Sequence, residues 1–291
     1  MNASRLTVGQ CASLACLLEV TAAKPGNVHR GADFEDLTYL DFATSAVVIA
    51  PAFDAAPRGA RLGKTVLAAV EATRSTVATN TNLGTILLLA PLAMTPVTEP
   101  LAPGVARVLA GLDAEDARLV YRAIRLAEPG GLGEVDEADV RGEPPPDLRA
   151  AMLLAAERDL VARQYANDFA EVLGSVVPWL DDGLRQGWTL ADTIIRVHLR
   201  LMSQFPDSLI LRKCGADTAE RSAALATAAL AAGMPGDQAY HDALADLDFW
   251  LRSDGHRRNP GTSADLIAAG LFAALRDGII KLPLREGGSR R

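Results

Sequence analysis

One stretch organises this 291-residue chain, and it reads His256-Arg257-Arg258-Asn259-Pro260-Gly261-Thr262-Ser263-Ala264-Asp265-Leu266-Ile267-Ala268-Ala269-Gly270-Leu271. The proline and glycine stop any preceding helix, and Thr262 or Ser263 can cap a new helix over 263–276. A helix start carries unpaired N–H groups and partial positive charge. With Arg257 and Arg258 beside it, this turn predicts an anion-binding corner suited to phosphate. The alternative is an ordinary turn between helices with solvated arginines.

A helical period recurs along nearly the whole chain, and the sequence has no alternating β-branched runs bounded by tight turns. The first helix must end before Pro25, because the residue before a proline is pushed out of the α conformation. We therefore predict an all-α fold: one compact domain of about ten to twelve helices over 1–284 and a disordered tail at 285–291. Further helices are expected near 37–55, 59–78, 83–94, 104–111, 115–127, 148–173, 175–185, 189–203, 217–231 and 237–252.

The composition indicates a soluble globular protein, with 49% hydrophobic and 22% charged residues. The chain has 29 basic and 36 acidic residues and a formal net charge of −7. This balance provides no global attraction to nucleic acid or to an anionic membrane, so an anionic ligand must be held by local clusters. We expect small-molecule partners, no nucleic acid and no membrane, and the sequence leaves a homodimer open.

Cysteine usage and the absence of a targeting segment indicate a reducing cytoplasm. The cysteines Cys11, Cys16 and Cys214 have no CxxC spacing and an odd count, which argues against a disulfide framework or a structural zinc site. The start of the chain lacks a basic segment followed by a long apolar run, and the apolar stretch 85–93 is too short to span a bilayer.

Polar residues gather at helix junctions, where helical proteins commonly build ligand sites. In the first junction Glu19 ends a helix, and Lys24, Asn27 and Arg30 line a rigid turn. A polar connector with basic side chains reaching to solvent is the alternative. The second junction is Thr79-Asn80-Thr81-Asn82-Leu83-Gly84-Thr85, whose side chains can hold a ribose or a base edge or can simply cap the next helix.

Three further junctions carry charge. Around Glu128, the glycines of 130–133 follow a helix rather than a strand, which rejects a dinucleotide fingerprint and favours a left-handed helix stop. Next, Asp159, Arg163 and Asn167 share one helix face and can form a surface ion pair or a buried polar stripe. In the segment 205–215, Asp207 can cap a short helix that ends in two cations, which either bind a ligand or complement the helix end.

The sequence matches no more specific phosphate-binding or metal-binding motif. Gly63-Lys64-Thr65 resembles the end of a phosphate-binding loop, but Arg58 stands where that loop needs a glycine. The four histidines are too scattered to predict a metal cluster.

Four ordered blocks together resemble the triphosphoribosyl-dephospho-CoA synthase family. They are Glu19 with Lys24-Pro25-Gly26-Asn27-Val28, then Asn80-Thr81-Asn82-Leu83-Gly84, then Pro206-Asp207-Ser208-Leu209-Ile210 with Arg212-Lys213, and Asn259-Pro260-Gly261-Thr262-Ser263-Ala264-Asp265-Leu266. The resemblance implies an all-α enzyme that joins C1′ of the ATP ribose to a hydroxyl of 3′-dephospho-CoA and releases adenine. In the family the second block usually continues from Asn-Thr into His-Lys-Gly, whereas this chain has Asn82-Leu83-Gly84. The segments 123–133 and 163–167 resemble a branch found alongside one-carbon cofactor metabolism, so a related acceptor is open.

Under this resemblance the junction residues receive roles. The catalytic carboxylates are expected to be Glu19, Asp207 and Asp265, with one as general base and another binding Mg²⁺ or stabilising the sugar cation. For the Mg²⁺ that accompanies ATP, the expected ligands are Glu19 and Asp207. Basic side chains are expected to bind the phosphates, and amide and hydroxyl side chains are expected to bind the sugar or the base. This binding set is Lys24, Arg30, Arg212, Arg257, Arg258 and Lys213, with Asn27, Asn80, Asn82, Asn259 and Ser263.

Two alternatives remain at this stage. One is ATP-dependent ribosyl or phosphoryl transfer to a different acceptor in one-carbon cofactor biosynthesis. The other is a non-catalytic helical protein that binds nucleotides. Release of adenine rather than ADP separates glycosyl from phosphoryl transfer, and tight ATP binding without turnover indicates the non-catalytic protein.

Overall fold

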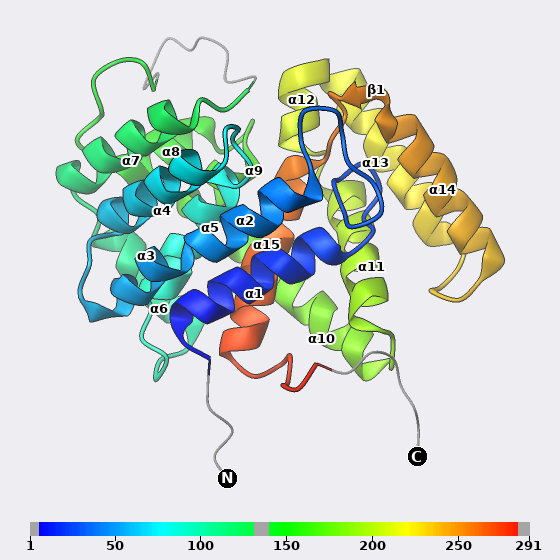
Figure 1. Ribbon diagram of the computed structural model, residues 1–291, viewed down its shortest axis with the longest axis horizontal. Helices are drawn as coiled ribbons and strands as arrows, with labels where there is room; N and C mark the ends of the chain where they lie inside the picture. Colours follow the sequence, from blue (N-terminus) through cyan, green and yellow to red (C-terminus); the bar gives the residue numbers. More distant parts are fainter. Residues whose placement is uncertain (1–5, 131–139, 285–291) are drawn as a thin grey trace.

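The structure, a computed structural model, describes residues 6–130 and 140–284. It is helical, as predicted, apart from the short strand β1 (Ser253–His256) and isolated bridges (Figure 1). Its helices are α1 (Val8–Thr21), α2 (Tyr39–Val48), α3 (Ala50–Ala55), η1 (Ala56–Arg58), α4 (Leu62–Thr76), α5 (Leu83–Met94), α6 (Leu101–Ala110), α7 (Ala114–Ala127), α8 (Leu148–Ala155), α9 (Leu160–Ala166), η2 (Val172–Val176), α10 (Val177–Arg185), α11 (Leu190–Gln204), α12 (Ser208–Cys214), α13 (Ala216–Ala231), α14 (Gln238–Arg252) and α15 (Gly261–Arg276). The expected tail at 285–291 lies outside the described residues.

The helix count exceeds the expected ten to twelve because two expected helices are broken. The segment 37–55 divides into α2 and α3 next to Pro51, whose ring cannot join the hydrogen-bond ladder. The segment 148–173 ends a first helix at Ala155 and restarts at α9, where Asp159 is the N-cap. After α9, Asp168 and Phe169 adopt left-handed φ values of 58° and 65°. Asp159, Arg163 and Asn167 still follow one another at helical spacing, as the N-cap, an interior residue and the C-cap of α9, but the helix that carries them is shorter than expected.

Helix α15 is the centre of the main core. It packs against α1, α5, α9, α10, α11, α12 and η2, and Figure 1 shows α1 and α2 crossing in front of it. Apolar residues surround it on nearly every side, as expected of a helix buried along its length. At Gly270 an added Cβ would lie 2.3 Å from Val176 Cγ1, so the glycine permits the close approach of η2. A second, smaller apolar cluster joins α11, α12, α13 and α14.

A proline in α5 is compensated from outside the helix. Pro91 has no N–H, so the carbonyl of Leu87, four residues earlier, loses its helical donor. The hydroxyl of the fully buried Tyr165 on α9 donates to that carbonyl at 2.7 Å. Burial raises the pKa of Tyr165, which keeps its proton on this bond. This contact joins α9 to α5 and lets an apolar helix with an internal proline stay unbroken.

The stretch Tyr39–Arg58 is, within the described part of the chain, long and apolar enough to cross a membrane by length and composition, with a mean hydropathy of 1.2. It is divided into α2, α3 and η1, and α2 and α3 pack against α1 and α4. We therefore describe it as part of the helical assembly.

Replacement of Tyr165 by Phe tests this compensation. The change leaves the buried Leu87 carbonyl unpaired and should reduce the free energy of unfolding by about 1–3 kcal/mol. Pro91→Ala restores the helical N–H, so in that background Tyr165→Phe should cost less. Chemical denaturation of the four proteins of this double-mutant cycle measures the coupling. Equal losses from Tyr165→Phe in both backgrounds would contradict the proposed compensation.

Candidate active site

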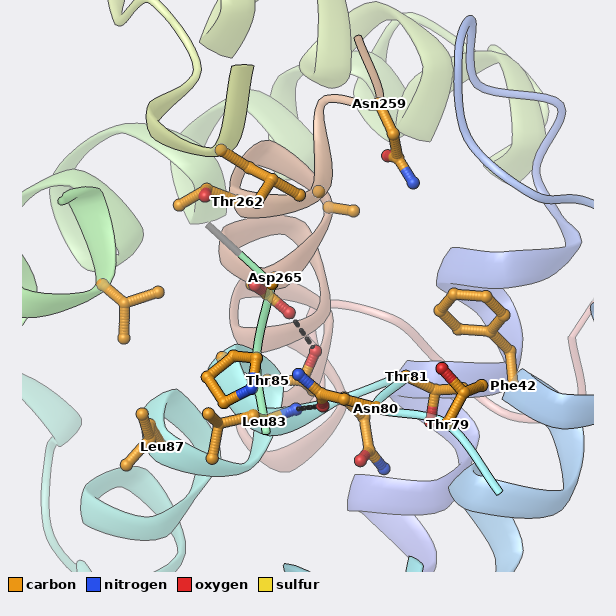
Figure 2. A pocket seen from close by; sticks show the side chains of 18 of the residues that line it. Phe42, Thr79, Asn80, Thr81, Leu83, Thr85, Leu87, Asn259, Thr262 and Asp265 are labelled. Carbon is orange, nitrogen blue, oxygen red and sulfur yellow. Dashed lines mark hydrogen bonds between the residues drawn. The ribbon is translucent and has the colours of Figure 1, made fainter. Parts of the chain in front are cut away.

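Every junction singled out in the sequence contributes to one cavity of about 580 Å³. Its walls come from the end of α1, the loops before α2 and α5, the start of α9, and from α12 and α15 (Figure 2). The predicted site residues that line it are Glu19, Asn27, Asn80, Asn82, Arg212, Lys213, Asn259 and Asp265. Those outside its wall are Lys24, Arg30, Asp207, Arg257, Arg258 and Ser263.

Asp265 is the central carboxyl group of the cavity. It lies on the second turn of α15, and its Oδ1 accepts a hydrogen bond of 2.6 Å from Thr85 Oγ1 (Figure 2). Burial raises the pKa of Asp265 to about 8; the Thr85 bond lowers it, and the negative charge of Glu19 raises it. Asp265 therefore carries a proton at neutral pH. An added Cβ at Gly84 would lie 2.1 Å from Asp265 Oδ2, so only glycine leaves this oxygen room at the start of α5.

Glu19 is the second carboxyl group, and its partner is Lys24. Glu19 Oε1 lies 2.8 Å from Lys24 Nζ, and the fully buried Lys24 also donates to the carbonyls of Glu19 and Ala22. Glu19 borders the cavity, whereas Lys24 is enclosed behind it. The ammonium of Lys24 is already used to hold Glu19, so this geometry does not favour the expected role of Lys24 in phosphate binding.

Asp207 occupies a different place from the one expected. Its Oδ1 accepts from the N–H groups of Leu209 and Ile210 at 2.9 and 3.2 Å, which confirms that it caps the short helix α12. Its Oδ2 accepts from the backbone N–H and the hydroxyl of Ser263 at 2.7 and 2.8 Å. Burial raises the pKa of Asp207, and these hydrogen bonds lower it. With both oxygens occupied and no place in the cavity wall, Asp207 has the geometry of a helix cap rather than of a base or metal ligand.

The same contact corrects two expectations about the start of α15. Neither Thr262 nor Ser263 caps its own helix, whose N-cap residue is Pro260 and has no side-chain cap bond. Ser263 is fully buried and bonded to Asp207, a geometry that favours a structural role over substrate binding. The cap is supplied by Asp207 from α12.

The arginines of the predicted anion-binding corner point elsewhere. Arg257 donates to the carbonyl of Lys213 at 3.3 Å and lies 3.6 Å from Asp254. Arg258 stacks over the Trp250 ring at 4.7 Å and donates to the Trp250 carbonyl at 3.0 Å. Arg30 is exposed and also outside the cavity wall. For these residues the alternative, solvated or structural arginines, agrees better with the geometry.

Other cations do border the cavity. Arg212 forms an ion pair with Asp159 at the cavity wall, which also shows that Asp159 does not pair with Arg163. Lys213 follows it and has no ion pair among the described residues; burial and the neighbouring Arg212 lower the pKa of Lys213. Arg74, on α4, borders the cavity as well and lies 3.1 Å from Glu128.

Sequence reasoning missed two contributors. Arg74 lies inside a helix with no motif around it, so only the packing of α4 brings it to the cavity. His256 was expected only as part of the anion-binding corner; its Nδ1 lies 3.0 Å from Asp36 Oδ1, and both residues line the cavity. At Glu128 the left-handed helix stop is present, with φ 49°, but the residue is not a glycine. Gly131 and Gly133 lie outside the described residues.

Four asparagines form a polar wall. Asn80 Oδ1 accepts from the Leu83 N–H at 3.2 Å, so the capping alternative holds for this residue. Asn82 is the N-cap residue of α5, but its side chain makes no cap bond. Asn27 Nδ2 donates to Asn259 Oδ1 at 2.6 Å, which links the first and last of the resembling blocks.

The residues offer little to hold a metal ion by themselves. In the described ranges no group of three or more His, Cys, Asp or Glu side chains gathers as a metal site. The geometry does not favour the expected pair of Glu19 and Asp207 as metal ligands, because both oxygens of Asp207 accept hydrogen bonds from backbone N–H groups. Glu19 and Asp265 remain as cavity carboxyl groups, which suits a Mg²⁺ ion that arrives with most of its ligands from the nucleotide phosphates.

Comparison with known proteins shows the family of the chain. The profile of a family described as ATP:dephospho-CoA triphosphoribosyl transferase matches residues 5–282. A solved structure from Archaeoglobus fulgidus, provisionally described as a triphosphoribosyl-dephospho-CoA synthase, is 26% identical with a TM-score of 0.60; the match covers 80% of this chain and 98% of that one. A comparison with curated proteins finds no match. The chain belongs to the ATP:dephospho-CoA triphosphoribosyl transferase family, whose enzymes transfer a triphosphoribosyl group from ATP.

Proposed function

We propose that the cavity is where this enzyme binds ATP and its acceptor, 3′-dephospho-CoA or a related cofactor precursor, and that Asp265 and Glu19 move the protons. The carrying observation is the pairing of a proton-bearing Asp265 with a Lys24-bound Glu19 in one cavity. We also propose that residues 1–284 act as one catalytic domain in the cytoplasm. The residues that line the cavity come from both ends of the chain, which supports this single domain.

The transfer needs balanced proton movement. The bond between C1′ of the ATP ribose and the adenine nitrogen breaks, and its electron pair leaves with adenine. The acceptor hydroxyl oxygen forms the new bond to C1′ and gives up its proton. One group must therefore protonate the departing purine while another takes the hydroxyl proton.

Asp265 has the properties of the acid. It holds its proton at neutral pH, its Oδ1 is fixed by Thr85, and Gly84 leaves room beside Oδ2. When the proton has passed to adenine, the Asp265 carboxylate also stabilises the positive charge that develops at C1′. These features favour Asp265 as general acid rather than as base.

Glu19 has the properties of the base. Oε1 is held by Lys24, and within the described part of the chain no other group donates to Oε2. Two carboxyl groups in one site with environments this different can divide acid and base roles. The arrangement supports Glu19 as the acceptor of the hydroxyl proton.

Phosphates are best placed against Arg212, Lys213 and Arg74. Arg212 and Arg74 are each held by a carboxylate, and a triphosphate can take over those contacts with charge-assisted hydrogen bonds. Mg²⁺ would neutralise phosphate charge, with most of its ligands supplied by the phosphates themselves. The family's usual His-Lys pair is replaced here by Asn82 and Leu83, two buried residues without a charge. The positive charge for the phosphates would therefore come from basic residues on other walls of the cavity.

The acceptor is tested by incubating the protein with ATP, Mg²⁺ and 3′-dephospho-CoA. Adenine together with a triphosphoribosyl adduct of the acceptor, resolved by chromatography and mass spectrometry, is the expected result. Adenine without that adduct would move the search to related cofactor precursors. ADP in place of adenine would overturn the proposal in favour of phosphoryl transfer.

Asp265→Asn tests the acid. The variant should lose about 10²–10⁴ in kcat, because the amide cannot protonate adenine. In the wild type, kcat should fall as pH rises through about 8, where Asp265 loses its proton. The free energy of unfolding should also fall as pH rises from 3.8 to about 8, because in this range the folded protein keeps the Asp265 proton and the unfolded chain does not. Asp265→Asn should remove that decline. A pH profile of kcat unaltered in shape by the substitution would exclude Asp265.

Glu19→Gln and Asp207→Asn separate chemistry from capping. Glu19→Gln should reduce kcat by about 10²–10⁴. Asp207→Asn replaces one acceptor by an NH₂ group facing N–H donors and should cost about 1–3 kcal/mol of unfolding free energy. Its kcat, corrected for the folded fraction, should stay within about tenfold of wild type, well short of an acid–base loss. Normal stability of Asp207→Asn with a kcat loss equal to that of Glu19→Gln would return Asp207 to the mechanism.

Lys213→Ala tests the phosphate assignment against Arg257→Ala as the matched control. Removing a charged hydrogen-bond donor to phosphate should raise KM by about 10- to 100-fold. Arg257 lies outside the cavity wall, so its removal should leave KM within about twofold, because a surface ion pair contributes little. The reverse pattern in steady-state kinetics would place the phosphates at the corner before α15.

A further inference from the structure

His256 is a polar side chain of the cavity to which the proposed transfer gives no role. All four histidines lie in the described part of the chain, and only His256 lines the cavity. His198 is fully buried, and burial lowers its pKa to about 3. His29 accepts a hydrogen bond from the Gly31 N–H at 3.2 Å, and His241 is exposed on α14. His256 is therefore the imidazole that a bound molecule can contact.

The imidazole of His256 is held on one side and open on the other. Its Nδ1 lies 3.0 Å from Asp36 Oδ1, and Phe34 meets the ring edge-on with 5.8 Å between the ring centres. The carboxylate that faces Nδ1 fixes a proton on that nitrogen. Nε2 has no partner within the described residues and is not among the fully buried unpaired atoms, so it is accessible to a ligand.

Lys213 borders the same part of the cavity. Arg257, the next residue after His256, donates to the Lys213 carbonyl at 3.3 Å, and Cys214 Sγ donates to the Arg257 carbonyl at 3.4 Å. These two bonds hold the end of α12 against the segment that carries His256. Asp36 is close to both side chains, because burial lowers the pKa of Lys213 and the negative charge of Asp36 opposes that shift. The long side chain of Lys213 can therefore reach a ligand group that contacts the imidazole.

Lys213 is also the cation of this corner that is left for an anion. The charged groups packed around the imidazole are Asp36 on the loop before α2, Lys213 and Arg212 on α12, Arg252 on α14, and Asp254, Arg257 and Arg258 beside His256. Each of these arginines forms an ion pair, whereas Lys213 has none among the described residues. An anion at this corner is therefore expected to bind Lys213, with the imidazole beside it.

From this arrangement we propose that Nε2 of His256 binds a phosphate group at the Lys213 end of the cavity, and that Asp36 positions the imidazole for this contact. Because Nδ1 donates to Asp36, Nε2 donates to a phosphate oxygen when the ring carries both protons. The Asp36 carboxylate then balances the charge of the imidazolium, and the phosphate receives a charge-assisted hydrogen bond.

This inference rests on the proposed function for the presence of a nucleotide and deepens it by adding a residue that holds phosphate. ATP and 3′-dephospho-CoA both carry phosphate groups, so the shared chemistry is the phosphate and the two sources are separated by experiment. Binding measured without turnover keeps this contact distinct from the transfer reaction.

His256→Asn and His256→Gln separate the two ring nitrogens. The amide nitrogen of asparagine can take the place of Nδ1 and keep the Asp36 contact, so His256→Asn removes only the Nε2 donor. The longer glutamine places its amide nitrogen near the position of Nε2 and gives up the Asp36 contact. His241→Asn, on the exposed face of α14, is the matched control. Thermal unfolding of each variant establishes the folded fraction before binding is compared.

Binding is measured by calorimetry with ATP and Mg²⁺ in the absence of acceptor, and with 3′-dephospho-CoA in the absence of ATP. His256→Asn should weaken at least one of the two ligands by about tenfold or more, since a hydrogen bond to a charged group has about that effect. His256→Gln should lose less, and His241→Asn should stay within about twofold of wild type. The ligand that is weakened identifies the source of the phosphate. Unchanged affinity of His256→Asn for both ligands, or a loss confined to His256→Gln, would overturn the proposal.

The imidazole itself gives a second readout that does not depend on affinity. In protein labelled with ¹⁵N-histidine, the Nε2 resonance of His256 is identified by its absence from His256→Asn. Saturation with the ligand that His256→Asn binds more weakly should shift this resonance and leave those of His29, His198 and His241 in place. A His256 resonance that neither ligand moves would also overturn the proposal.

Adenine release is scored separately in the wild type. Weaker binding by His256→Asn without adenine release in the wild type would keep the phosphate contact and reject the proposed transfer at this site. Adenine release with unchanged affinity of His256→Asn would reject the phosphate contact and keep the transfer.

Discussion

The carboxylate of Asp207 connects the starts of two helices, and the position of the cavity depends on that connection. One oxygen caps α12 and the other receives the N–H and hydroxyl of Ser263 in the first turn of α15. Because this carboxylate fixes the position of the two helix starts relative to each other, Arg212 and Lys213 on α12 and Asp265 on α15 border the same cavity. A buried carboxylate is stable here because it accepts four hydrogen bonds.

A second buried charge has a comparable role at the other end of the sequence. Lys24 is fully enclosed, and its ammonium is used by Glu19 and two backbone carbonyls. Removing two charges from water is costly, and the cost is offset only when geometry and hydrogen bonds are good. The result is a fixed Glu19 at the cavity edge, near enough to Asp265 for its charge to raise that pKa. Proton affinity in this site is therefore set by packing between α1 and α15.

The fold class and most helices could be predicted because apolar spacing and helix stops are local. Helix α5 begins and ends at the predicted residues, and the first helix ends before Pro25 as expected. The break at Asp159 could not be predicted, because the spacing of Asp159 and Arg163 also fits a continuous helix. In the structure Asp159 pairs instead with Arg212, 53 residues away. The role of Tyr165 beside Pro91 was hidden for the same reason: the donor and the unpaired carbonyl are 78 residues apart.

The sequence by itself determined the helical class, the junctions that border the cavity and the family, because these depend on residue types and their order. Only the tertiary structure decided which polar residues face a ligand. Lys24, Asp207 and Ser263 are residue types as suited to a binding site as Asp265 or Lys213. Their polar groups are nevertheless bonded to neighbouring segments of the chain. Arg74 enters the site although no motif surrounds it, because α4 packs beside the cavity. A side chain is free to bind only when the folded chain leaves its donors or acceptors unpaired, and that is a property of contacts between distant residues.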